Sequence, residues 1–462
     1  MRDNFGLPMK WKLTTCAVAT LLALGMTPAL ADTDADISAL KKELEAQRKQ
    51  LAEQNKLIQQ LLGDQEAKLQ ATGPAAPTAS PGNQPGLQKQ DDLKPTFTFY
   101  GTLDVNVIDS NSGFGNKVNI GTGGMYASSL GVKLQRDLGS SLHAFGEFEA
   151  GLGINYGTVG NGAAALGTNN GAPSSGGLLG TGSQVFSRQA YVGLGSDRFG
   201  SLSAGRQYAP SYIAIAGHGN AMGGGFFGNS ATLLASIGGM PTRFNNALAY
   251  VSPVFAGFKT ELEYTTGTEN NVAVNTAIGT TTTTATAGRG YDLALFYKNG
   301  PFDSMLTTWN VKAATFVTAG ESGLATKRGV QLVANYDFGF MKLYGLYVNG
   351  KINGGNYENV TKTLSKASGG GLSGQIPMGR NKLYLEWAHL NDDSLANRDG
   401  TLFGAAYAYE LSPGYKVYAS WGKLINNRNG TYALLDGSDI LGNVTRAGFS
   451  PSGFMTGLNY AF

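Results

Sequence analysis

Cysteine is nearly missing from this chain of 462 residues, which contains only Cys16. A single cysteine excludes a disulfide-stapled scaffold and a cysteine-ligated zinc or iron–sulfur centre. Histidine is scarce as well, and none of the three residues, His143, His218 and His389, stands in a recognisable metal-binding or catalytic motif. The sequence therefore predicts no metal site and no bound cofactor.

Charge is the second shortage, because charged residues make up 15% of the chain against about 25% in ordinary globular domains. The net charge of +3 offers no extended basic surface, so nucleic acid is not an expected partner. Long apolar runs are missing outside the N-terminus, which excludes a bundle of membrane-spanning helices. Glycine is in excess instead, with 67 residues, about twice the usual share.

The first 31 residues have the pattern of a secretory signal peptide. Basic residues at Arg2, Lys10 and Lys12 precede an apolar stretch over residues 13–26, and residues 29–31 read Ala-Leu-Ala, an A-x-A cleavage site. The alternative is an uncleaved membrane anchor, for which the apolar stretch is short. We therefore predict that the protein is exported and cleaved after residue 31.

Two different segments follow the signal peptide. Residues 32–70 are rich in Ala, Leu, Glu, Gln and Lys and predict a helix. A heptad seam runs along it through Ile37, Leu44, Leu51, Ile58 and Gln65, with Leu40, Gln47, Gln54 and Leu61 three residues later in each of the first four heptads. This pattern favours a self-associating coiled coil, with an isolated amphipathic helix as the alternative. Residues 71–95 hold five of the 15 prolines and predict an extended Pro/Gly-rich linker.

The remaining residues, 96–462, alternate apolar and polar side chains in short segments. Leu383, Leu385 and Trp387, for example, alternate with Lys382 and Glu386. This period of two predicts strands with one apolar face, in either a soluble sandwich or a membrane barrel. Seven short connections occur between the segments, at residues 137–140, 196–200, 252–257, 298–303, 337–340, 376–380 and 410–415.

Longer stretches rich in Gly, Asn and Thr alternate with these short connections, as at residues 153–183 and 265–289. Short turns alternating with long loops are typical of outer-membrane barrels. Seven hairpins with one further strand at each end predict an all-β, 16-stranded antiparallel transmembrane β-barrel. Such a barrel encloses an aqueous channel. Both termini then lie on the short-turn side, which places the coiled coil in the periplasm.

Residues 97–462 resemble the trimeric Gram-negative general porins of the β-proteobacterial type. The matching stretches are FYGTLDVNV from Phe99, SSLGVKLQRDLGSSL from Ser128, FSRQAYVGLGSDRFGSLSAGRQY from Phe186, RFNNALAYVSPVFAGF from Arg243, and the terminal GLNYAF. The resemblance implies a homotrimer in the outer membrane, and Phe462 is similar to the terminal aromatic residue by which such barrels are recognised for assembly. An N-terminal periplasmic coiled coil is an addition carried by some trimeric porins.

The resemblance also implies a third loop folded into the barrel, here residues 208–242, which faces basic wall residues across a constriction. Arg188 in FSRQAYVGL and Arg243 in RFNNALAY match wall arginines of the family. A further position that usually carries Arg aligns with Ser129, which weakens the basic ladder. Lys133 has the same parity as Ser129 and is expected to compensate in part.

The alternation of side chains along each strand predicts which face of the barrel these residues occupy. Arg188 shares its parity with apolar residues, while the opposite parity, which includes Tyr191, is also poor for lipid contact. A subunit interface on this face resolves the conflict. Arg206 falls on the outward parity of its strand, so we expect Arg206 and Tyr191 at that interface. Glu147 and Glu149 share the lumen parity and are expected at the constriction, paired with wall bases.

The sign of charge is the clearest indication of function. From Arg198 to Thr260 there is no Asp or Glu, so the third loop contributes no carboxylate. A basic excess in a pore favours anions. We therefore predict an outer-membrane porin for passive diffusion of small hydrophilic solutes and ions, with a mild anion preference, against the alternative of weak or no selectivity. The expected partners are outer-membrane lipid, lipopolysaccharide, further copies of the chain and small solutes.

Other functions remain open at this stage. One is a substrate-specific channel for small carboxylates or other anions. Another is an envelope tether that links the outer membrane to the cell wall through the coil. An outer-membrane protease or lipase is disfavoured, because such an enzyme needs a clustered nucleophile and base that the sequence does not contain.

Overall fold

The computed structural model describes residues 94–113, 115–155, 157–159, 185–267, 272–275, 281–284, 288–314, 324–353, 365–395, 397–436, 439–440 and 446–462, together with residues 45 and 49. The chain divides into two units, Met1–Gly86 and Leu87–Phe462. Glu45 and Lys49, the described residues of the first unit, are helical. The predicted signal peptide, the rest of the predicted coil and residues 71–93 of the predicted linker lie outside the described residues and stay predictions.

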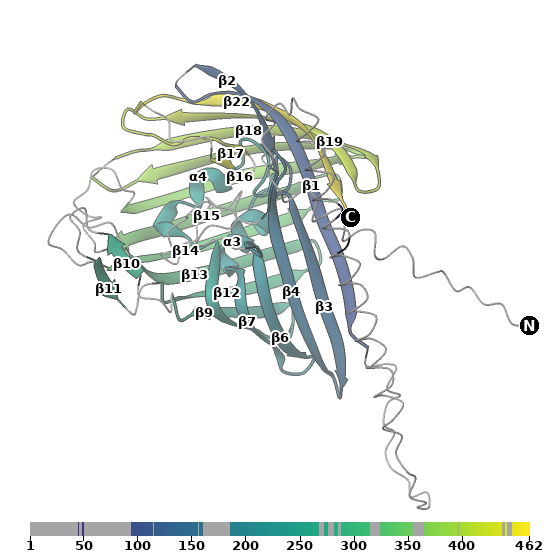
Figure 1. Ribbon diagram of the computed structural model, residues 1–462. Coiled ribbons are helices and arrows are strands. Elements are labelled where there is room, and N and C mark those ends of the chain that lie inside the picture. The colour runs from purple at the N-terminus through teal and green to yellow at the C-terminus, as the bar shows by residue number, and fades with distance from the viewer. Residues whose placement is uncertain are drawn as a thin grey trace, which may run out of the picture. The chain divides into compact units, whose positions relative to one another are not determined.

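The second unit is a closed antiparallel β-barrel (Figure 1). Among the described residues, sixteen long strands form its wall, and each pairs with its neighbour along the chain. Pairing of β1 with β22, from Thr102 opposite Ala461 to Asn111 opposite Ser452, closes the barrel. The predicted number of wall strands is therefore confirmed. The wall strands are β1 (Thr96–Asn111), β3 (Ser129–Gly139), β4 (Leu142–Gly153), β6 (Gln189–Ser196), β7 (Gly200–Tyr208), β8 (Arg243–Val251), β9 (Phe258–Thr265), β12 (Gly290–Asn299), β13 (Phe302–Ala314), β14 (Leu324–Asp337), β15 (Lys342–Asn353), β16 (Lys366–Met378), β17 (Asn381–Asp392), β18 (Gly400–Ser412), β19 (Tyr415–Asn426) and β22 (Ser452–Ala461).

Shorter elements lie in the long connections between these strands. They are β2 (Asn116–Thr122), β5 (Thr158–Val159), β10 (Val272–Asn275), β11 (Thr281–Thr284), β20 (Leu435–Asp436), β21 (Asp439–Ile440), α3 (Pro210–Ile213), the π-helix η3 (Ala214–His218), α4 (Ala231–Leu234) and the 3-10 helix η4 (Ile237–Gly239). Within the described part of the chain, no helix combines the length and the apolar character needed to cross a bilayer.

All seven predicted short connections join neighbouring wall strands. Each contains one glycine with a positive φ, between 54° and 85°. This left-handed conformation lets a tight turn reverse the chain without a clash of Cβ with the backbone. The glycines are Gly139, Gly200, Gly257, Gly300, Gly339, Gly379 and Gly414. Seven of the 67 glycines thus have a local cause, the tight turn at one end of each hairpin.

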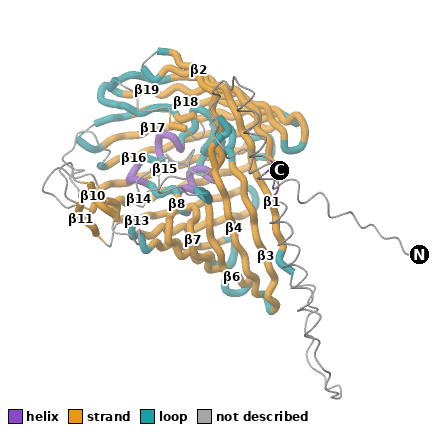
Figure 2. The backbone as a smooth tube through the Cα atoms, in the orientation of Figure 1, coloured by secondary structure: helices purple, strands orange, loops and turns teal. Residues whose placement is uncertain are grey.

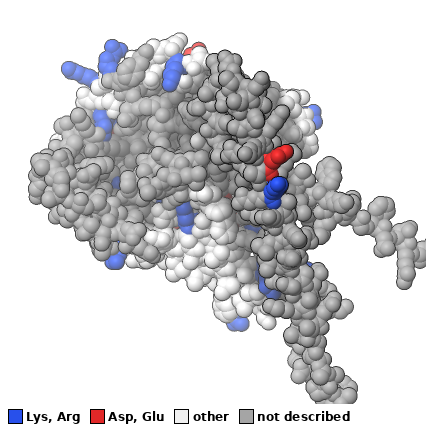
Figure 3. Space-filling view, in the orientation of Figure 1, with Lys and Arg blue, Asp and Glu red and all other residues white. Residues whose placement is uncertain are grey.

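Alternation along each strand separates an outer apolar face from an inner mixed face. On β17, the side chain of Leu385 is on the outside with 50% of the residue exposed, whereas Tyr384 and Glu386 on the inside are 4% and 6% exposed. An apolar outer face is what a barrel surrounded by hydrocarbon requires. On the face drawn in Figure 3, uncharged surface dominates the described part, and basic side chains lie mainly around its edge.

The connection between β7 and β8, residues 209–242, accounts for much of the apolar core. Its short helices (purple in Figure 2) contribute Ile215, Leu234 and Ile237 to a cluster of buried side chains from β12 to β19, β22 and β1, and Phe227 between the helices belongs to the same cluster. Trp309 of β13 belongs to the same cluster, and its Nε1 donates a hydrogen bond to the carbonyl of Gly238 at 3.1 Å. Many inward side chains of these wall strands are therefore apolar where they contact the connection.

Candidate functional site

Two carboxylates of β4 organise a hydrogen-bond network on the inner face of the wall. Glu147 and Glu149 are 9% and 6% exposed. The Tyr100 hydroxyl lies 2.6 Å from an oxygen of each carboxylate and can donate its proton to either. Gln189 Nε2 donates to Glu147 Oε1 at 2.8 Å, and the Tyr191 hydroxyl donates to Glu147 Oε2 at 2.8 Å. Neutral donors from β1 and β6 therefore hold Glu147 in place, and the Tyr100 hydroxyl of β1 holds Glu149.

Cross-strand register brings the network together. Glu147 lies directly opposite Lys133 of β3 and Tyr191 of β6. Lys133 Nζ is 4.0 Å from Glu147 Oε1 and 4.9 Å from the centroid of the Tyr100 ring. Gly131 leaves space for that ring, since a Cβ at this position would lie 2.4 Å from Tyr100 Cζ. The Lys133 side chain is 57% exposed, so it presents the solvent-facing charge of this network.

Two guanidinium groups flank one aromatic ring beside the carboxylates. Arg243 Cζ lies 4.1 Å from the centroid of the Tyr208 ring, and its Nη2 donates to the Tyr208 hydroxyl. Arg188 Cζ lies 5.7 Å from the same centroid, and its Nε pairs with Glu149 Oε1. The Tyr208 ring is stacked on Tyr212, with centroids 5.5 Å apart. Cation–π contacts of this kind orient the cations over the ring face.

The five residues predicted at the constriction thus form one connected cluster. Lys133 and Glu147 meet through their charges, Tyr100 bridges Glu147 to Glu149, and Arg188 links Glu149 to the ring on which Arg243 also lies. We call this set, with Tyr100 and Tyr208, the charged cluster. Its role in the pore stays a prediction at this point.

The parity conflict at Arg188 has a structural explanation. Arg188 precedes β6, which begins at Gln189, so the regular alternation of that strand does not apply to it. Its backbone N–H still donates to the Glu149 carbonyl at 3.1 Å, which keeps the residue beside β4. The side chain can therefore turn to the inner face, although its parity matches the outward Val192 and Leu194.

Arg206 lies at an irregularity of β7. The pairing of β7 with β8 shifts register between Gly205 and Gln207, which interrupts the alternation used to assign Arg206 outward. Arg206 is 7% exposed; its Nε donates to the Ser187 carbonyl at 2.8 Å, and its Nη1 donates to Asn245 Oδ1. These contacts, and that of Tyr191 with Glu147, lie within one chain. A role of Arg206 and Tyr191 at a subunit interface stays a prediction.

Several acidic residues that the sequence analysis did not single out hold the connection over 209–242. Asp292 of β12 accepts hydrogen bonds from the N–H and hydroxyl of Ser211, at 3.1 and 2.8 Å. Glu386 of β17 accepts the N–H of Ser230 at 2.7 Å. The sequence did contain a signal for their inward direction, because they alternate with outward apolar residues, as Glu386 does with Leu385. Among the described residues, no group of His, Cys, Asp and Glu side chains could hold a metal ion.

Comparison with known proteins identifies the family. Residues 71–430 match the family model described as Gram-negative porin. The chain belongs to this family. The porin is similar to the outer membrane porin protein 32 of Delftia acidovorans, with 27% identity over 379 residues that cover 79% of this chain and 94% of the relative. An outer membrane porin protein of Bordetella pertussis is 27% identical over 319 residues, covering 63% and 75%.

Solved structures share the fold of this porin. The anion-selective porin from Comamonas acidovorans superimposes with a TM-score of 0.63 at 22% identity, covering 80% of this chain and all of that one. A loop-deletion mutant of OmpT from Vibrio cholerae gives a TM-score of 0.55 at 16% identity, covering 80% and 99%. The porin is thus an outer-membrane channel protein, and its family and fold are those of channels and not of enzymes.

Proposed function

We propose that this porin passes small hydrophilic solutes with a mild preference for anions, and that the charged cluster sets the preference. The arrangement of Arg188 and Arg243 on the Tyr208 ring carries the proposal, because it fixes two positive charges on the inner wall. Rings of basic side chains favour anions in pores. The relative from Comamonas acidovorans is described as anion-selective, which supports the same reading here.

The carboxylates of the charged cluster do not fully offset the positive charge of its basic residues. Glu147 and Glu149 accept hydrogen bonds from neutral donors and lie beside Lys133 and Arg188. The connection over 209–242 contains no Asp or Glu. Of the carboxylates that contact it, Asp292 and Glu386 are 0% and 6% exposed and therefore contribute little to the potential in the aqueous lumen. Asp303, which is less buried, lies 2.9 Å from Nδ1 of His218 in the connection.

We propose further that residues 209–242 form the inward-folded third loop that narrows the channel. Support comes from its hydrogen bonds to strands spread around the wall. Ser211 bonds to β12, the N–H of Ala221 donates to Ser373 of β16, and the N–H of Phe227 donates to Ser420 of β19. A segment with partners on strands so far apart in the barrel leaves less of the cross-section open.

Neutralising the two arginines is expected to reduce the anion preference. The measurement is the reversal potential of the purified native oligomer in a planar bilayer under a salt gradient, for Arg188→Ala, Arg243→Ala and the double variant. The reversal potential should move toward zero by a larger amount at 0.1 M than at 1 M salt. The length over which salt screens a charge falls from about 10 Å to about 3 Å between these concentrations, so the charges of the arginines act less strongly at 1 M. Arg380→Ala is the matched control, because Arg380 is exposed at a short turn outside the cluster. A cation preference in the native protein would overturn the proposal.

Neutralising the carboxylates is expected to act in the opposite direction. In Glu147→Gln with Glu149→Gln, the amides keep acceptor oxygens for Tyr100 and Gln189, while Lys133 and Arg188 lose their negative partners. The same reversal-potential measurement should then show a stronger anion preference. Asp109→Asn, at an exposed outward position of β1, is the matched control. An unchanged or weaker anion preference would show that these carboxylates do not influence the pore.

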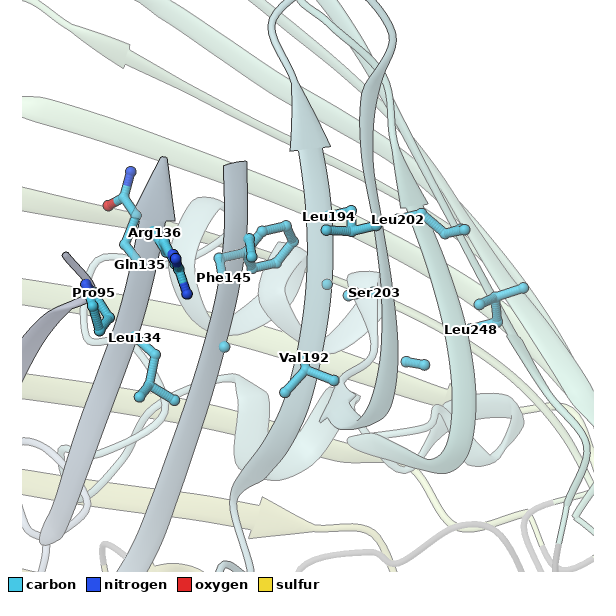
Figure 4. A pocket seen from close by; sticks show the side chains of 14 residues that line it. Pro95, Leu134, Gln135, Arg136, Phe145, Val192, Leu194, Leu202, Ser203 and Leu248 are labelled. Carbon is cyan, nitrogen blue, oxygen red and sulfur yellow. The ribbon is translucent and has the colours of Figure 1, made fainter. Parts of the chain in front are cut away.

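We propose that the porin is a homotrimer that associates through the outer face of β3, β4, β6, β7 and β8. Figure 4 shows a depression on this face, whose lining includes Leu134, Val192, Leu194, Leu202 and Leu248. The lining also includes small residues, Ala144, Gly146 and Ala204, which allow a neighbouring surface to approach closely. OmpT of Vibrio cholerae, which shares the fold, is described in a trimer form. A substrate-specific channel and an envelope tether through residues 32–70 stay predictions.

A further inference from the structure

The Tyr100 hydroxyl of β1 has two carboxylate neighbours but only one hydrogen. Its oxygen lies 2.6 Å from Glu147 Oε1 and 2.6 Å from Glu149 Oε2. Both distances are those of short, strong O–H···O hydrogen bonds. A tyrosine hydroxyl supplies one hydrogen and an ionised carboxylate supplies none, so one of the two contacts would lack a hydrogen if both glutamates were ionised. One additional proton, shared by the two carboxyl groups, would complete both hydrogen bonds.

Arg188 indicates where this additional proton would lie. Its Nε pairs with Glu149 Oε1, a contact that favours the ionised form of Glu149. The additional hydrogen would therefore be held mainly on Glu147 Oε1, which could donate it to the Tyr100 oxygen. The Tyr100 hydroxyl would donate its own hydrogen to Glu149 Oε2. Each hydrogen bond then has one donor and one acceptor, and the pair of glutamates keeps one negative charge.

The groups next to the pair are compatible with a shared proton. Lys133 Nζ is 4.0 Å from Glu147 Oε1, beyond hydrogen-bond distance, and its side chain is 57% exposed, so water screens its charge. The contacts of Glu147 with β6 come from Gln189 and Tyr191, which donate as neutral groups. Glu261 of β9 interacts electrostatically with Tyr191, which adds negative charge on this side.

The remaining basic group near the pair is separated from it by an aromatic ring. Arg188 and Arg243 flank the ring of Tyr208, which is stacked on Tyr212. Arg243 Nη2 donates to the Tyr208 hydroxyl. Of these two guanidinium groups, that of Arg188 contacts the glutamates directly, and it is already matched by one negative charge.

We propose that Tyr100 is a positioning residue that sets the charge of the pore wall, because its hydroxyl lets Glu147 and Glu149 share one proton at neutral pH. The two carboxyl groups then carry one negative charge, where two separate carboxylates would carry two. The basic excess of the charged cluster is larger by one unit charge as a result. This inference rests on the proposed anion preference and makes that preference depend on pH.

The test is the pH profile of the reversal potential in a planar bilayer, measured for the purified native oligomer and for Tyr100→Phe. Phenylalanine keeps the ring in the space left by Gly131 and removes the hydroxyl. Both carboxyl groups then ionise, so the anion preference at pH 7 should be weaker than in the native protein, although no charged residue is replaced. One unit charge about 8 Å from a permeating ion changes the ratio of anion to cation permeability by about twofold at 0.1 M salt.

The two proteins should converge at about pH 9, where lysine side chains still keep their charge. Loss of the shared proton gives the native protein the same two negative charges as Tyr100→Phe, so its anion preference should fall to that of the variant. A displaced side chain would not produce this convergence. Glu147→Gln keeps a neutral group beside Tyr100 at every pH. It should match the native protein at pH 7 and retain that preference at pH 9.

Tyr409→Phe is the matched control for removal of one hydroxyl. Tyr409 is on β18 with the outward parity of Tyr407, which is 42% exposed. This variant should follow the native profile at both pH values. A loss of preference at pH 7 in Tyr409→Phe as large as that in Tyr100→Phe would overturn the proposal, since the hydroxyl of Tyr100 would then have no special effect.

A second readout does not depend on ion preference. The infrared difference spectrum of the native protein against Glu147→Gln at pH 7 should contain the C=O band of a protonated carboxylic acid, which an ionised carboxylate lacks. Absence of this band would overturn the shared proton. If the band is present but the native protein shows no anion preference, the proposed function fails and the shared proton stands. If Tyr100→Phe and the native protein show the same anion preference at pH 7, the shared proton fails and the proposed function stands.

Discussion

Replacing Asp104 by alanine is expected to lower the stability of the folded barrel by about 4 kcal/mol, because it leaves several buried donors without an acceptor. Asp104 is on the inner face of β1 and is fully buried. Its carboxylate accepts the N–H groups of Gly124 and Met125 at 2.8 and 3.0 Å, the Tyr418 hydroxyl at 2.6 Å and the Asn459 amide at 2.9 Å. One side chain thus joins the first long loop to β19 and β22.

The measurement is the thermal unfolding of the purified protein in detergent, followed by circular dichroism. Asp109→Ala is the matched control, since Asp109 is an exposed residue of the same strand, and the expected change there is within about 0.5 kcal/mol. Asp104→Asn keeps one acceptor oxygen and should fall between the two. Equal unfolding of Asp104→Ala and Asp109→Ala would mean that water replaces the lost acceptor without penalty.

Replacing Gly404 by valine is expected to release the connection over 209–242 from the wall. Gly404 of β18 faces Gly228 in that connection, and a Cβ at position 404 would lie 2.2 Å from the Gly228 carbonyl oxygen. Gly422 of β19 also contacts Gly228, because a Cβ added at position 228 would lie 2.8 Å from Gly422 Cα. Both contacts are between backbone atoms, so no flexible side chain can move to relieve a clash. Overpacking of this kind costs up to about 3 kcal/mol.

Amide hydrogen exchange of residues 220–236 measures this release. A local loss of about 3 kcal/mol corresponds to exchange that is roughly 100-fold faster in this segment. Gly374→Val is the control, because position 374 is on the outer face of β16 and a Cβ there would have no neighbour closer than 3.9 Å. If both variants exchange at the native rate, the contact between Gly228 and the wall does not hold the connection in place.

The wall of the barrel was predictable from local sequence. Alternation with a period of two has one physical cause, the opposite direction of successive side chains in a strand, and it holds wherever the strand is regular. The short turns were equally visible, since a residue such as Gly200 or Gly339 is required where φ is positive. These signals need no knowledge of distant residues, which is why the strand number and all seven turns are confirmed.

Irregular backbone limited the prediction of side-chain direction. Arg188 lies just before a strand and Arg206 lies at a register shift, so parity counted from neighbouring residues does not give the direction of either side chain. A bulge is a property of two paired strands, and the sequence of one strand does not show it.

Contacts between residues more than 150 positions apart were not predictable from the sequence. The hydrogen bonds of Ser230 with Glu386 and of Tyr418 with Asp104 join residues 156 and 314 positions apart. Sequence patterns placed Glu386 on the inner face but gave no partner for it. The hydrogen bonds that hold the long loops against the wall therefore became visible only in three dimensions.

The seam between β1 and β22 also orders the folding of the chain. Backbone hydrogen bonds between Gly101 and Phe462 at 3.1 Å continue the pairing of these two strands beyond Thr102 and Ala461. Among the described strands, every other wall pairing joins strands that follow each other in sequence, so this pairing is the one that must wait for the two ends of the sheet to meet. Until then the sheet has two edges with unpaired N–H and C=O groups, which hydrocarbon does not tolerate. A chain lacking β22 would therefore remain an open sheet with unpaired edges and would not close into a slightly smaller barrel.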